Sequence, residues 1–171
     1  MGRKIKNMPQ QKIQEEFIYE GLGFPIVLKN VPMIYIRDSW VLNIKLNLFQ
    51  KVVLLELAFR EYILTGNQIK FIRLWLGLTQ TEFGNLLGVT HPAVVKWEKY
   101  ENESSKMTLT TQRDLRFLIL DRLLCEDKIF RKAFRNVFER KFSNTRQPLH
   151  FDVQKEFETI KNYGKLAMQS A

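Results

Sequence analysis

Residues Gln68–Glu98 read QIKFIRLWLGLTQTEFGNLLGVTHPAVVKWE, and this stretch decides the expected fold. Its pattern of apolar residues and turn residues predicts three short helices joined by tight connections. Thr79 and Glu82 form a capping box at the start of the second helix. Gly88 ends that helix, because glycine readily takes the left-handed backbone conformation that a helix end often needs.

The second and third of these helices are expected to pack closely. Gly84 lies inside a helix, where glycine costs about 1 kcal/mol relative to alanine, so its missing side chain indicates a close neighbour. Thr90 caps the third helix, and Pro92 is tolerated there because amides in the first turn have no helical partner. Together these signals predict a helix-turn-helix, which presents its last helix to a DNA major groove.

Leu78–Thr90 resembles the pattern of the Cro/CI-type, or XRE-type, helix-turn-helix family, and the resemblance extends over about residues 68–103. The resemblance implies sequence-specific DNA binding. It also implies that Gln80 contacts a phosphate and supports the recognition helix. Arg73 and Glu98 match a structural ion pair of the family.

The third helix has two different faces. Val94 and Trp97 are expected to point inward, Trp97 as a core residue rather than a base-stacking one. On the other face Lys96 can donate to a guanine or to a phosphate, and His91 is either a base or phosphate contact or an ordinary surface histidine. The candidate DNA-binding residues are Gln80, Thr81, Thr90, His91, Pro92, Ala93, Val95, Lys96 and Lys99.

The charge of the chain favours a polyanionic partner. Its 171 residues carry a net charge of +9, with a pI near 9.7, and nucleic acid is the first partner such a balance suggests. Residues 65–103 are neutral, whereas residues 104–171 carry +6. The densest basic run is Lys128–Arg146, which is either a solvated helix face or a phosphate-binding one. Its candidate phosphate contacts are Lys128, Arg131, Lys132 and Arg135.

We expect a mainly α fold with a small N-terminal β element, that is, an α+β protein with a Cro/CI-type core and C-terminal helices. Residues 1–14 are predicted to be a flexible basic arm. Residues 15–64 are predicted to form two or three short strands, with a turn at Asp38-Ser39, and a helix from Leu46 to about Leu64. Residues 65–103 form the DNA-binding core in this scheme.

Residues 104–171 are predicted to be a basic helical region that could hold a dimer interface. Thr110-Thr111 is expected to cap a first helix, and apolar residues from Ile129 to Phe138 indicate a second. Residues 143–150 are predicted to be a loop and residues 151–168 a terminal helix.

Several classes of function are disfavoured. Cys125 is the only cysteine, so neither a disulfide framework nor a multi-cysteine metal site can form, and with two histidines we expect no bound metal and no cofactor. The sequence offers no nucleophile–base set and no phosphate-cradling loop, so we expect no enzyme. An export signal and a membrane span are not recognised, which favours a cytoplasmic, nucleoid-associated protein.

A small strand-containing N-terminal part before an XRE-type motif is similar to the MqsA-type antitoxins and related regulators. Those proteins carry an N-terminal zinc site of paired cysteines, which this chain lacks, so the resemblance implies a zinc-free relative. The stretch from Gly21 to Pro32 is similar to a motif of such relatives.

The expected function is a sequence-specific, double-stranded DNA-binding transcriptional regulator. A homodimeric repressor is favoured, because two recognition helices related by a twofold axis read a palindromic operator. The alternative is an antitoxin-like interaction module that binds a toxin or another protein through residues 17–64 and autoregulates its operon.

Overall fold

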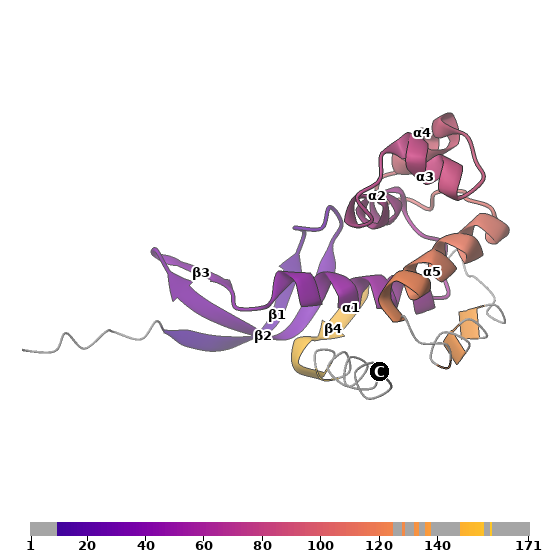
Figure 1. Ribbon diagram of the computed structural model, residues 1–171. Coiled ribbons are helices and arrows are strands. Elements are labelled where there is room, and N and C mark those ends of the chain that lie inside the picture. The colour runs from indigo at the N-terminus through magenta and orange to yellow at the C-terminus, as the bar shows by residue number, and fades with distance from the viewer. Residues whose placement is uncertain are drawn as a thin grey trace, which may run out of the picture.

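The computed structural model describes residues 10–124 and 148–155, together with residues 128, 132, 133, 136, 137 and 158. The fold is α+β, with a mixed sheet and a set of helices that gather at one end of it (Figure 1). The strands are β1 (Gln11–Tyr19), β2 (Ile26–Ile36), β3 (Ser39–Leu42) and β4 (Leu149–Asp152). The helices from residue 46 to residue 124 are α1 (Leu46–Phe59), α2 (Gly66–Trp75), α3 (Gln80–Leu86), α4 (His91–Glu98) and α5 (Leu109–Leu124).

β2 is the central strand of the sheet. It pairs antiparallel with β1 along its length, antiparallel with β3 at its end, and parallel with β4 at its start. Arg37 and Asp38 link β2 to β3 with φ angles of 49° and 62°, as a tight hairpin turn requires. The turn predicted near Asp38 is therefore present, whereas the strands β1 and β2 are longer than the short ones expected.

The predicted flexible arm of residues 1–14 is wrong for its last residues. β1 begins at Gln11, and Gln14 lies opposite Val31 of β2. These polar residues give little strand signal by themselves, but pairing with an apolar strand overrides local preference. Residues 1–9 lie outside the described part of the chain.

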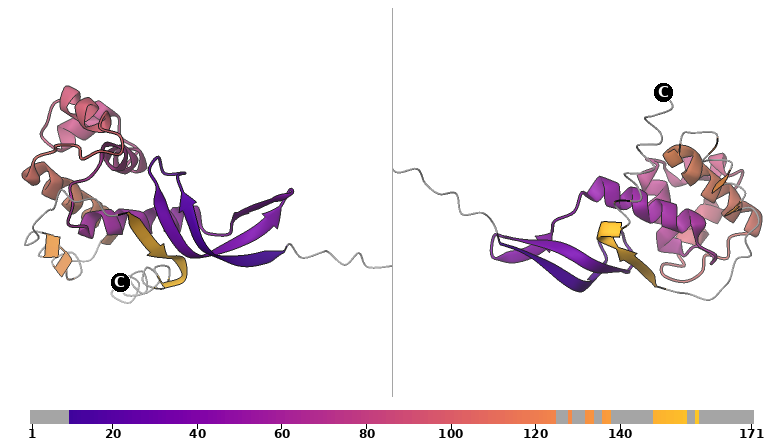
Figure 2. Two further views of the ribbon diagram at one scale, coloured as in Figure 1. Left: turned by 180° about the vertical axis from the view of Figure 1, so that it is seen from behind. Right: turned by 90° about the horizontal axis from the view of Figure 1, so that it is seen from below.

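α1 lies across one face of the sheet, as the two further views also show (Figure 2). The rings of Tyr19 and Phe49 meet edge to face, with 5.4 Å between their centroids. The helix ends at Phe59 and not near Leu64, because Arg60 is already extended. In the link that follows, Tyr62 and Leu64 are buried and Ile63 is half-buried, and Thr65 forms a bridge with Ser104.

The C-terminal predictions need two corrections. Thr108, not Thr110-Thr111, caps α5, since its hydroxyl accepts from the Thr111 amide at 3.3 Å. The predicted loop and terminal helix are wrong over residues 149–152, which form β4 beside β2. Parallel pairing between segments so far apart in sequence leaves no local signal. Residues 143–147, 156, 157 and 159–168 of those predictions lie outside the described residues.

The core runs without interruption from the sheet to α4. One cluster of buried apolar side chains contains Ile26 and Leu28 of the sheet, Leu57 of α1, Ile119 of α5 and Trp97 of α4. α1 packs on α5, and α4 packs on both α2 and α3. Within the described residues, no helix combines the length and the apolar character needed to cross a membrane.

Candidate nucleic-acid interface

The helices α2 and α3 both begin with a capping box. The Thr79 hydroxyl accepts from the Glu82 amide at 3.2 Å, and the Glu82 carboxylate accepts from the Thr79 amide at 2.7 Å. The hydrogen bonds that the Thr79 amide and the Thr79 hydroxyl donate to the Glu82 carboxylate hold the pKa of Glu82 below its usual value. Thr65 and Gln68 form the same motif at α2, which the sequence analysis missed although the Thr-x-x-Gln spacing is its signature.

The turn between α3 and α4 has the geometry that its glycines predicted. Gly88 has a φ of +65°. A Cβ atom at Gly84 would lie 2.9 Å from the carbonyl oxygen of Val89 and 3.4 Å from a methyl group of Val94. The close neighbour expected at Gly84 is therefore the turn itself together with α4.

A buried ion pair joins the beginning of the three-helix unit to its end. Arg73 of α2 donates to both carboxylate oxygens of Glu98 in α4, at 2.6 and 3.0 Å, and also to the Leu78 carbonyl at 2.9 Å. Gln80, the first residue of α3, donates its side-chain amide to Glu98 at 2.8 Å. The structure thus contains the pair expected between Arg73 and Glu98, and it ties Gln80 to the same carboxylate.

These contacts fix which face of α4 is uncovered. Val94 and Trp97 are buried against α2 and α3, with 0% and 8% of their surfaces exposed. Ala93 and Val95 are half-buried. Thr90 occupies the cap position, but its hydroxyl makes no capping hydrogen bond, contrary to expectation. The candidate residues that are exposed to solvent are Thr81, Thr90, His91, Pro92, Lys96 and Lys99.

The balanced charge of residues 65–103 is distributed unevenly. Arg73 and Glu98 neutralise one another inside the unit, and Glu82 is held at the start of α3 by its capping box. Lys96 of α4 and Lys99 directly after it stay exposed, as do Glu101 and Glu103 in the segment that follows. The uncovered face of α4 is therefore cationic although the unit as a whole is neutral.

Two of the candidate phosphate contacts after α5, Lys128 and Lys132, lie in the described part of the chain, and the structure does not bring them to this face. Lys128 and Lys132 are exposed, and the described pieces of residues 128–137 lie on the far side of α5 from α4 in both Figure 1 and the left view of Figure 2. Arg131 and Arg135 lie outside the described residues. A duplex seated on α4 of one protomer is therefore not expected to reach Lys128 or Lys132.

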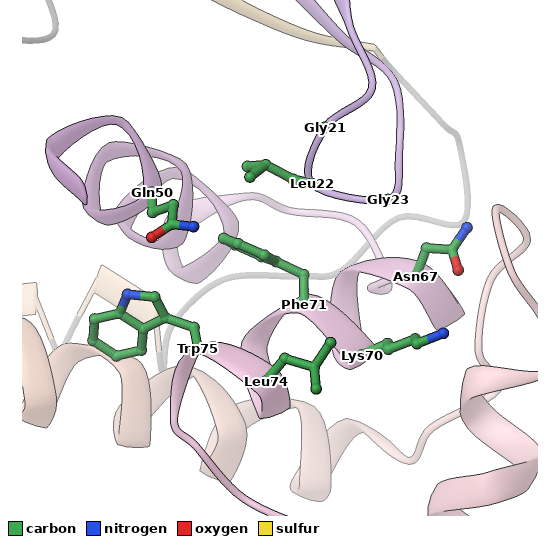
Figure 3. Close-up of a pocket in the computed structure, with 9 residues that line it drawn as sticks. All are labelled: Gly21, Leu22, Gly23, Gln50, Asn67, Lys70, Phe71, Leu74 and Trp75. Atoms are coloured by element: carbon green, nitrogen blue, oxygen red, sulfur yellow. The ribbon is translucent and has the colours of Figure 1, made fainter. Parts of the chain in front are cut away.

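A pocket of about 800 Å³ lies beside the three-helix unit, and the sequence analysis did not foresee it (Figure 3). The β1–β2 turn forms one wall with Leu22, and α2 forms another with Phe71 and Trp75. Lys70 is its only charged lining residue. The described residues contain no group of three or more side chains suited to a metal ion.

No family model matches the sequence, and no curated protein or solved structure matches it significantly.

Proposed function

We propose that this protein is a sequence-specific regulator of transcription that binds double-stranded DNA with α4 in the major groove. The observation that carries the proposal is the exposed cationic face of α4, with His91, Lys96 and Lys99 uncovered, on a helix whose opposite side is buried. An α-helix fits the major groove, and its exposed side chains can then reach base edges.

The network around Glu98 supports this function. A recognition helix must be held rigidly, because each base contact depends on the position of the helix to within a fraction of an ångström. Arg73 and Gln80 fix α4 from two other helices. The side-chain amide of Gln80 lies at the amino end of α3, where a phosphate would also be attracted by the free amides.

The finer proposal is a Cro/CI-type core in a homodimeric repressor of the cytoplasm or nucleoid. Such a dimer reads two half-sites that are related by a twofold axis. It competes with RNA polymerase for its operator and needs no cofactor for this.

Selection of bound fragments from random duplex DNA, at near-physiological salt, tests the proposal. An inverted repeat with half-sites about one helical turn apart is expected among the enriched fragments. If no sequence is enriched above nonspecific retention, the proposal fails and the antitoxin-like interaction module becomes the better account.

Lys96→Ala tests the role of α4 directly. If Lys96 reads a base, discrimination between the operator and random DNA should fall by about 1–3 kcal/mol. If it contacts a phosphate, binding to all duplexes should weaken, and the salt dependence of log K should become shallower by about 0.9. Lys132→Ala is the matched control, since Lys132 is equally exposed but lies beyond α5, and its affinity and salt slope should equal those of the wild type. An unchanged Lys96→Ala variant would contradict the docking.

A further inference from the structure

β1 leaves one edge of the sheet open. In the part of the chain that the structure describes, β1 pairs only with β2, so its other edge has no neighbouring strand. β1 has nine residues, and Ile13 and Ile18 on its two faces are 53% and 60% exposed. A long edge strand with exposed apolar side chains is a template for another strand.

The register shows which backbone groups face that open edge. The Gln10 carbonyl accepts from the Tyr35 amide at 2.9 Å, and the pairing continues with Gln11 opposite Ile34. Residues of an antiparallel ladder alternate between those that bond to the partner strand and those that point away from it. The odd-numbered residues from Gln11 to Phe17 therefore direct their amides and carbonyls outward. Pro32, which has no amide proton to donate, lies opposite Ile13, as this assignment requires.

Two opposite charges on β1 would face one another if a second copy of the strand ran antiparallel beside it. Lys12 is the second residue of the strand, with its ammonium 4.5 Å from the centre of the Trp40 ring, and Glu16 is the sixth; both are exposed. We propose that two copies of this chain pair through their β1 edges, antiparallel and about a twofold axis at Gln14, so that Lys12 of each copy faces Glu16 of the other. This pairing would join the two sheets into one continuous sheet.

Symmetry and charge favour this register over pairings in which the twofold axis lies one residue earlier or later. The outward backbone groups of the two β1 strands can bond to one another only if odd-numbered residues of one copy lie opposite odd-numbered residues of the other. An axis at Glu15 would set Glu15 against Glu15 of the second copy, and an axis at Ile13 would set Lys12 against the neutral Gln14. With the axis at Gln14, Lys12 and Glu16 form a non-hydrogen-bonded pair, the type in which opposing side chains lie closest. The twofold axis makes the ion pair occur twice.

The first test is a charge reversal on the full chain without DNA, followed by sedimentation equilibrium. Lys12→Glu and Glu16→Lys should each weaken dimerisation by about tenfold or more, because each places two like-charged pairs across the interface. The double variant should regain the wild-type dimerisation constant. Glu20→Lys, which changes the charge equally but lies beyond the paired residues, should have no effect. Circular dichroism checks that each variant is folded, since Glu16 also faces Lys29 within its own hairpin.

The second test fixes the register by disulfide formation in a Cys125→Ser background. Gln14→Cys should give a covalent dimer rapidly, since residues opposite one another at such a site are about 4.5 Å apart between Cα atoms, within disulfide range. Ile18→Cys should not, because its two copies would be about 27 Å apart along the strands.

Three results would overturn the inference: a monomer at all concentrations, a dimer indifferent to both charge reversals, or equal crosslinking at the two positions. The inference does not depend on DNA binding. An enriched inverted repeat together with intact dimerisation in the charge-reversed variants would place the dimer interface elsewhere and leave the proposed function standing.

Discussion

The geometry of the three-helix unit, α2 to α4, depends most on Glu98. Its carboxylate accepts hydrogen bonds from Arg73 of α2 and Gln80 of α3, and the side chains of Arg73 and Glu98 are only 10% and 8% exposed. Two charges that are paired and almost removed from water stabilise a fold little relative to an apolar pair, but the loss of one partner leaves the other buried and unpaired. The ion pair therefore specifies how α4 is oriented.

Arg73→Ala should lower the free energy of unfolding by about 3 kcal/mol, because Glu98 loses its cation and the Leu78 carbonyl loses a donor. Urea denaturation measures this loss. Lys70→Ala, an exposed site on the same helix, should stay within about 0.5 kcal/mol of the wild type. Equal midpoints for the two variants would show that the pair contributes nothing.

Among the helices, the first turn of α2 contacts the segment that directly follows α4. The Gly66 amide donates to the Glu103 carbonyl at 3.3 Å and the Asn67 amide to the Glu101 carbonyl at 2.7 Å. Amides in the first turn of a helix have no partner within it, so the segment after α4 satisfies them. These contacts hold the segment that follows α4, and with it the C-terminal end of that helix.

Gly66→Ala should destabilise the protein by about 2–3 kcal/mol, since overpacking at a rigid contact forces the backbone to shift. The added Cβ would lie 2.5 Å from the Trp97 carbonyl oxygen and 2.6 Å from the Glu101 amide nitrogen. Thermal unfolding monitored by circular dichroism gives the measurement. Asn67→Ala, which removes one exposed side-chain hydrogen bond to Asn102, should cost less than about 1 kcal/mol. A stabilised Gly66→Ala variant, as helix propensity alone would give, would contradict the close packing.

At the scale of the whole molecule, Arg116 of α5 connects segments that are distant in sequence. It is completely buried, and its guanidinium donates to the Leu57 carbonyl at the end of α1 and to the Tyr62 carbonyl in the link to α2. Gln112, one turn earlier, accepts from the Leu64 amide at 3.4 Å. Through these contacts α5 holds α1, which lies on the sheet, and the three-helix unit in one arrangement.

Arg116→Met should lower the free energy of unfolding by about 3 kcal/mol, because the buried carbonyls would lose a charged donor that an apolar side chain of similar length cannot replace. Chemical denaturation followed by fluorescence measures the loss. Arg122→Met, on the exposed side of the same helix, should change stability by no more than about 0.5 kcal/mol. If the two variants unfold together, Arg116 does not hold this junction.

Local sequence patterns were enough to predict the capping box, the turn and the inward face of the three-helix unit. The capping box at Thr79 and the left-handed Gly88 depend on interactions within a few residues, and the spacing of Val94 and Trp97 marks the side of α4 that packs inward; each of these features is present in the structure. The spacing of these residues also determined which face of α4 is exposed. DNA binding itself remains a proposal that these features support.

Three features depend on contacts between segments that are distant in sequence, and only the folded structure reveals them. β1 takes its register from β2, β4 pairs with a strand more than a hundred residues earlier, and the buried Arg116 meets carbonyls of α1 and the link. The polar residues at the start of β1 are typical of a flexible arm, and no local pattern indicates what Arg116 contacts, because these hydrogen bonds form only after the chain has folded back. The open edge of β1 likewise exists only once β2 has paired with its other side.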